Sequence, residues 1–120
     1  MKYLLLPAMV LVAALLVGAS PQAAPGTVAL VFTTGPGWDT SKSPNAQAQF
    51  GSHSANLRRL REAGVIVAGG RFGAYGLILV RAPSIDSAQA MLLPDSSIVV
   101  GTFKVEVNRW STIYEGTITR

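Results

Sequence analysis

The stretch VIVAGGRFGAYGLILVR at residues 65–81 decides the fold. It holds two apolar segments, 65–68 and 74–81, whose branched aliphatic side chains are typical of buried strands. Glycines between them, including the Gly69-Gly70 pair, predict that the first strand ends there and that Arg71 lies in a loop. Two consecutive strands therefore occupy the middle of the chain.

The residues before this pair predict a helix and another strand. Residues 44–63 favour a helix, with Ser43 as the N-cap, Pro44 at the first helical position and Gly64 as the residue that ends it. Residues 27–33 (TVALVFT) are apolar and β-branched, which predicts a buried strand.

The residues after the pair repeat this arrangement. Ser84 is expected to cap a second helix that ends at Leu93 before Pro94. Residues 103–110 alternate between apolar and polar side chains, as a half-buried strand does. Residues 112–118 are expected to add an edge strand or a tail that reaches a partner.

The predicted order of elements is β-α-β-β-α-β. This order indicates an α+β ferredoxin-like fold, in which a four-stranded antiparallel sheet carries two helices on one face.

The first residues have the three features of a secretory signal peptide. Lys2 gives a positive start, and the apolar run over residues 3–17 is shorter than the roughly 20 residues of a membrane-spanning helix. Small residues follow, so cleavage is expected after Ala23. Residues 1–23 would then be the signal peptide, and residues 24–120 one domain in the periplasm or outside the cell. A retained membrane anchor is the alternative interpretation.

Composition argues against several partners and chemistries. The chain has no cysteine, which excludes a lipid-anchored cysteine, a disulfide and a thiol nucleophile. The formal net charge of +4 is not gathered into a long basic stripe, so nucleic acid is not an expected partner. A membrane is not an expected partner either once the signal peptide is removed. No metal-ligand spacing and no phosphate-binding loop is present, so neither a metal nor a cofactor is expected.

Two spacings connect the chain to a known family. His53 lies 11 residues before Gly64, and Asp95 lies six residues before Gly101. With the strands and the helix between them, this ordered set resembles the YCII-related (YciI-like) family over about residues 28–110. Where the family commonly has Gly-Pro and Asp-Pro, this chain has Gly-Arg and Asp-Ser, which alters the walls of any pocket.

The resemblance implies a fold, an assembly and a site. Residues 24–120 would be a YCII-related ferredoxin-like domain that forms a homodimer by packing two sheets face to face, as in dimeric α/β barrels. It also implies a His–Asp active site formed by His53 and Asp95. Similar folds include isomerases of the muconolactone type, dehalogenating enzymes and monooxygenases, and most members of the family have no established reaction.

Helical spacing gives independent support for a buried histidine. Phe50, His53 and Leu57 share one helical face, so the imidazole is expected to point toward the sheet. It would need a polar partner there, and Asp95, which follows the second helix, is a candidate. A carboxylate that holds the imidazole would make it a general base. Alternatively, Asp95 caps the segment around Ile98 and His53 is a satisfied core residue.

Arg71 is the candidate substrate-binding residue. After the diglycine it could overhang a pocket and hold a carboxylate through two parallel hydrogen bonds. The alternative is a solvated arginine. Two functions remain open: a cofactor-independent enzyme that acts on a small organic acid, lactone or carbonyl compound, and a non-catalytic dimeric binding or accessory domain. Both leave room for a small-molecule ligand.

Overall fold

The computed structural model describes residues 26–120. Their elements, in chain order, are β1 (Gly26–Thr34), η1 (Pro44–Ala46), α1 (Phe50–Glu62), β2 (Ile66–Phe72), β3 (Tyr75–Ala82), α2 (Ile85–Ala90), α3 (Ser96–Val99) and β4 (Phe103–Trp110). The expected signal peptide over residues 1–23 lies outside the described residues.

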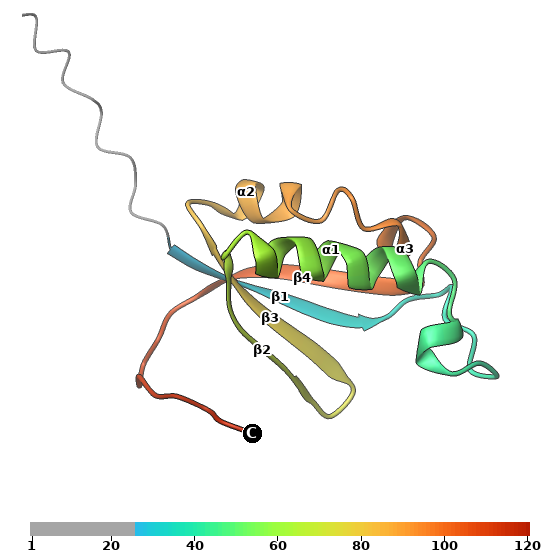
Figure 1. Cartoon of the computed structure of the whole chain (residues 1–120), viewed down its shortest axis with the longest axis horizontal. Coiled ribbons are helices and arrows are strands. Elements are labelled where there is room, and N and C mark those ends of the chain that lie inside the picture. Colours follow the sequence, from blue (N-terminus) through green and yellow to red (C-terminus); the bar gives the residue numbers. More distant parts are fainter. Residues whose placement is uncertain (1–25) are drawn as a thin grey trace, which may run out of the picture.

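The strands form one antiparallel sheet in the order β2-β3-β1-β4. The α-helices lie on one face of this sheet, and the β2–β3 hairpin extends away from beneath them (Figure 1). Strands β1 and β2 flank α1 in the sequence, yet β3 pairs between them, which is the split βαβ arrangement of ferredoxin-like domains. The predicted α+β ferredoxin-like fold is therefore confirmed.

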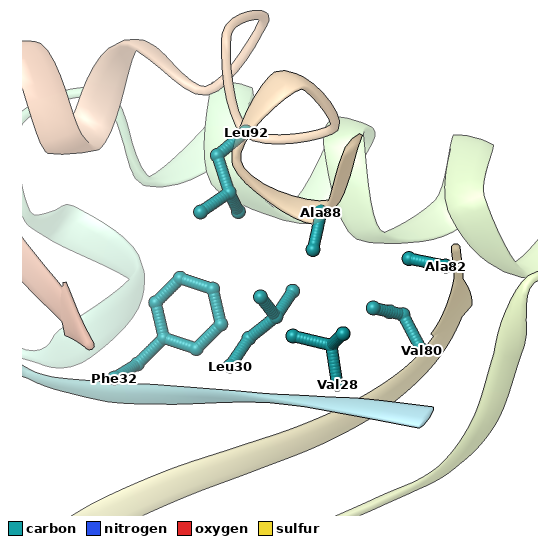
Figure 2. Packing of buried hydrophobic residues seen from close by; sticks show 7 residues of the cluster. All are labelled: Val28, Leu30, Phe32, Val80, Ala82, Ala88 and Leu92. Carbon is teal, nitrogen blue, oxygen red and sulfur yellow. The ribbon is translucent and has the colours of Figure 1, made fainter. Parts of the chain in front are cut away.

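The core lies between β1, β3 and the helices. Alternate residues of a strand share one face, and Val28, Leu30 and Phe32 of β1 point toward the helices. Figure 2 shows how their side chains meet those of β3 from beside and those of α2 and its following turn from above. The buried cluster consists of Val28, Leu30, Phe32, Val80, Ala82, Ala88 and Leu92.

The start of the first helix differs from the prediction. Ser43 and Pro44 do occupy the N-cap and first position of a helical turn, but this turn is the short 3-10 helix η1, and Ser43 makes no side-chain cap bond there. The predicted continuous helix over residues 44–63 is wrong, because α1 begins only at Phe50. The buried side chain of Gln47 instead bonds to backbone groups of the preceding loop, through hydrogen bonds of 2.7–3.1 Å. Gln49 has φ 59°, a left-handed conformation that interrupts a right-handed helix.

The end of α1 follows the prediction. Gly64 has φ 73°, which glycine adopts without a steric penalty. Its N–H donates to the carbonyl of Arg61, and the N–H of Val65 donates to the carbonyl of Leu60. These two bonds form a Schellman motif that satisfies carbonyls at the helix end.

Strand β2 is longer than predicted. Gly69 and Gly70 do not end it, because the backbone pairs with β3 as far as Phe72. Ladder hydrogen bonds use backbone groups only, so residues without side chains can keep the pairing. The loop position predicted for Arg71 is therefore wrong, since it lies within the strand.

The segment after β3 contains two short helices. Ser84 caps α2 as predicted and accepts a hydrogen bond from the N–H of Ser87 at 3.0 Å. The helix ends at Ala90, before the predicted Leu93, and α3 follows after a turn. Residues 112–118 form no strand. Within the described range of 26–120, none of the helices has the length and apolar character needed to cross a membrane.

No described helix covers the second face of the sheet (Figure 1). By strand alternation, Val31, Leu77 and Leu79 point to this face. Phe72 and Tyr75 pair at the tip of the hairpin, where their rings stack at 5.0 Å and are about half exposed. We call this surface the helix-free face.

Candidate functional site

The two predicted catalytic residues are in direct contact. His53 lies in the first turns of α1, and Asp95 immediately precedes α3. The Nδ1 atom of His53 lies 2.7 Å from Oδ2 of Asp95. Asp95 is fully buried and His53 is 9 % exposed, so the contact between Nδ1 and Oδ2 is shielded from bulk water.

Asp95 is also the N-cap residue of α3. Its Oδ1 atom accepts hydrogen bonds from the backbone N–H of Ser97, at 3.0 Å, and from the Ser97 hydroxyl. These bonds cap α3. Helix capping and histidine binding, which were alternatives at the level of sequence, therefore occur together, one on each carboxylate oxygen.

Asp95 is ionised at neutral pH. Burial is the largest influence on it and acts to raise its pKa, but the hydrogen bonds from His53 and Ser97 together outweigh burial and leave the pKa below its usual value. An ionised carboxylate only accepts hydrogen bonds. The proton of the His53–Asp95 bond is therefore on Nδ1, and in the neutral ring Nε2 keeps its lone pair.

Helix α1 is tied to the segment that carries Asp95. The Ser52 hydroxyl donates to the carbonyl of Pro94 at 3.1 Å and accepts from the N–H of Ser96 at 2.9 Å. One turn further along, the Asn56 side chain donates to the carbonyl of Met91 at 3.0 Å. These bonds fix the position of the carboxylate relative to the imidazole.

The second ring nitrogen of His53, Nε2, has no hydrogen-bond partner among the described residues, and the residue lines a cavity. Every fully buried side-chain nitrogen or oxygen in this part of the chain does have a partner, so Nε2 is not one of the fully buried atoms. Nε2 is therefore accessible to solvent, and His53 lines a cavity of about 430 Å³. This volume is within the range of small-molecule sites.

The cavity has an aromatic lining. The His53 ring lies 4.6 Å from the ring of Phe103 and 5.0 Å from that of Phe32, measured between centroids. Trp38 packs on Phe103 at 5.6 Å. The lining residues are Phe32, Thr33, Thr34, Trp38, Pro44, Phe50, His53, Ser54, Leu57, Gly70, Arg71, Ala74, Gly76, Ile78 and Phe103.

Strand register places Arg71 at the same cavity. Phe32 on β1 pairs with Gly76 on β3, and Gly76 pairs with Arg71 on β2. Paired residues of an antiparallel sheet point to the same face, so all three face the helices. The Arg71 side chain is exposed and forms no ion pair with any acidic side chain in the described part of the chain.

The loop after β1 forms one wall of the cavity. The N–H groups of Gly35 and Gly37 donate to the carbonyls of Thr102 and Gly101, at 2.9 and 2.8 Å. A Cβ atom at position 35 would lie 2.1 Å from the Gly101 oxygen, so this approach requires glycine. The close contact brings Trp38 over the start of β4.

Sequence reasoning found the His–Asp pair and Arg71 but missed the residues that shape the cavity. Trp38, Phe103 and Gly76 line it, and no motif marks them. Ser97 could have been found, because a serine two residues after an aspartate is typical of a capped turn. Across residues 26–120, no group of three or more His, Asp or Glu side chains could hold a metal ion.

Comparison of the chain with family models, with curated proteins and with solved structures finds no match in any of the three.

Proposed function

We propose that this protein is a cofactor-independent enzyme that uses His53 and Asp95 for acid/base chemistry on a small organic acid, lactone or other carbonyl compound. The observation that carries the proposal is the Nδ1–Oδ2 contact of 2.7 Å, which leaves Nε2 without a hydrogen-bond partner among the residues described, on a ring that lines the cavity. A buried carboxylate behind an imidazole fixes its tautomer and stabilises the imidazolium.

The proposed chemistry is a proton transfer next to a carbonyl group. Nε2 of His53 removes a proton from the carbon beside the carbonyl, and the carbon–hydrogen electron pair moves into the enolate. The negative charge of Asp95 stabilises the imidazolium that forms. The imidazolium then returns the proton to the same carbon or to a conjugated one, which gives exchange or isomerisation. Arg71 binds a carboxylate of the substrate at the other side of the cavity.

Proton exchange is a suitable assay because it does not require the final product to be known. A panel of small oxo acids and lactones is incubated in D₂O with protein expressed from the full-length chain, and loss of the α-proton signal is followed by NMR. We expect His53→Gln to lower the exchange rate by about 10²- to 10⁴-fold. Arg58→Gln, on the exposed side of α1, is the matched control. Equal rates in wild type and His53→Gln would refute the proposal.

A second candidate function is a non-catalytic dimeric binding or accessory domain. The observation that favours it is the helix-free face, where Val31, Leu77 and Leu79 offer an apolar surface to a second copy of the chain. Leu79→Lys should then convert a dimer to a monomer in analytical ultracentrifugation, while Arg58→Glu should not. This function also requires that His53→Gln leave binding and biological activity intact.

We also propose that the chain is a divergent YCII-related protein that is exported to the periplasm or beyond. The βαββαβ order and the contact between His53 and Asp95 support the first part. The sequence of residues 1–23 supports the second. N-terminal sequencing of protein recovered from the periplasmic fraction tests it, with cleavage after Ala23 as the expected result.

A further inference from the structure

The cavity beside His53 has a chemical character that narrows its ligand. Its walls are mostly apolar and include the aromatic rings of Phe32, Trp38, Phe50 and Phe103. Phe32 and Phe103 meet edge to face, with centroids 6.4 Å apart and an interplanar angle of 81°. Rings arranged in this way present both edges and faces to a ligand, which favours another flat ring.

The floor of the cavity depends on Gly76. This residue lies between Phe32 and Arg71 in the row of paired residues that faces the helices. A Cβ atom at position 76 would meet only the Cβ of Phe32 within 4 Å, at 3.7 Å. Backbone geometry therefore does not require glycine there, and the missing side chain leaves open the space between the aromatic wall and the arginine.

The charge of the site favours an anion. Arg71 has no ion-pair partner among residues 26–120. The carboxylate of Asp95 is already bonded by His53 and Ser97 and does not line the cavity. A planar guanidinium at the edge of an apolar cavity is suited to bind a carboxylate through two parallel hydrogen bonds.

We propose that the cavity binds a planar aromatic or conjugated monocarboxylate, with its ring over Gly76 and its carboxylate on Arg71, and that Gly76 determines this specificity. The inference rests on the proposed function in that it takes the same cavity as the substrate site. It narrows the substrate class from small organic acids in general to flat ones. A side chain at position 76 would occupy the place of the ring.

Tryptophan fluorescence offers a direct binding assay. The chain has two tryptophans, and Trp110 lies outside the cavity, so a Trp110→Phe background reports on Trp38 alone. The probes are benzoate, its saturated analogue cyclohexanecarboxylate and the neutral benzamide. We expect benzoate to bind about two- to tenfold more tightly than cyclohexanecarboxylate, the range that aromatic pairing supplies. Benzamide, without a charge, should bind about tenfold more weakly than benzoate.

Two variants test the geometry. Arg71→Gln should weaken benzoate binding by about tenfold and leave benzamide binding unchanged. Gly76→Val should abolish binding of all three probes while the melting temperature holds or rises, because valine suits a strand better than glycine. Gly51→Ala is the matched glycine control, since position 51 is exposed and does not line the cavity.

The outcomes separate this inference from the proposed function. Equal affinity for benzoate and cyclohexanecarboxylate, full benzoate affinity in Gly76→Val, or no benzoate binding at millimolar concentration would overturn the inference. Benzoate binding that is weakened by Arg71→Gln and abolished by Gly76→Val supports the inference. If such binding persists while His53→Gln retains full proton exchange, the acid/base function is refuted and the ligand assignment stands.

Discussion

Replacing Asp95 with asparagine distinguishes the two roles of its carboxylate, which are capping α3 and binding His53. Oδ1 accepts from the backbone N–H of Ser97, and Oδ2 accepts from His53. Asparagine keeps one oxygen and gains an amide that donates. A backbone N–H cannot reverse its direction, whereas an imidazole can move its proton to the other nitrogen. We therefore expect the oxygen to keep capping α3, the new amide to donate to Nδ1 of His53, and Nε2 to become protonated.

The size of the effect follows from the bonds that change. Hydrogen bonds to a charged group contribute about 1.5–3 kcal/mol and neutral ones about 0.5–1.5 kcal/mol, and the carboxylate accepts three. Removing the buried charge offsets part of this loss, because burial is the main influence that opposes ionisation of Asp95. We expect Asp95→Asn to lower the free energy of unfolding by about 1–2 kcal/mol. Asp95→Ala also removes the cap and leaves buried donors unpaired, so it should cost about 3–5 kcal/mol.

Two measurements check this expectation. Urea denaturation at pH 7 gives the two losses of stability. Nitrogen-15 NMR gives the tautomer, and its interpretation is simple because His53 is the only histidine in the chain. Equal losses for the asparagine and alanine variants would refute separate roles for the two oxygens. A proton that stays on Nδ1 in Asp95→Asn would refute the assignment of donor and acceptor.

Three further predictions concern stability. Because folding lowers the pKa of Asp95, its ionised form stabilises the fold above the unfolded pKa of about 3.9 and loses this effect as pH falls through the lower folded pKa. The stability difference between wild type and Asp95→Asn should therefore shrink as the pH falls below about 4 in acid titrations followed by circular dichroism. Leu30→Ala, in the buried core, should lower the free energy of unfolding by about 2–5 kcal/mol in urea, and Val31→Ala, on the helix-free face, should cost less. Gly35→Ala should lower the melting temperature, because its Cβ would lie 2.1 Å from a carbonyl oxygen, whereas Gly51→Ala should raise it in the same thermal scan.

Local side-chain patterns predicted those elements whose signals lie within the element itself. The alternation in residues 103–110 and the glycine at 64 gave β4 and the end of α1, since both signals are local. The start of α1 and the extent of β2 depend on other contacts. Gln47 bonds to a loop that precedes it, and β2 continues through two glycines because its backbone pairs with β3. No pattern in the neighbouring residues carries that information.

The candidate site divides in the same way. The contact between His53 and Asp95 was predictable, because helical spacing turned the histidine toward the sheet and the chain order placed the aspartate beside the same face. The alignment of Phe32, Gly76 and Arg71 was not. These residues belong to three strands, and only the register of the sheet brings them into one row.

Asp95 both caps α3 and binds His53, so heating that unwinds α3 also affects the histidine. Helix α3 has four residues, too few to be stable without its cap and its contacts with α1. When this turn unwinds, the Asp95 carboxylate moves away from His53. The imidazole then loses its orientation while the strands remain paired. The acid/base activity that we propose should therefore be lost several degrees below the temperature at which the sheet melts cooperatively, so activity and unfolding should show separate thermal midpoints.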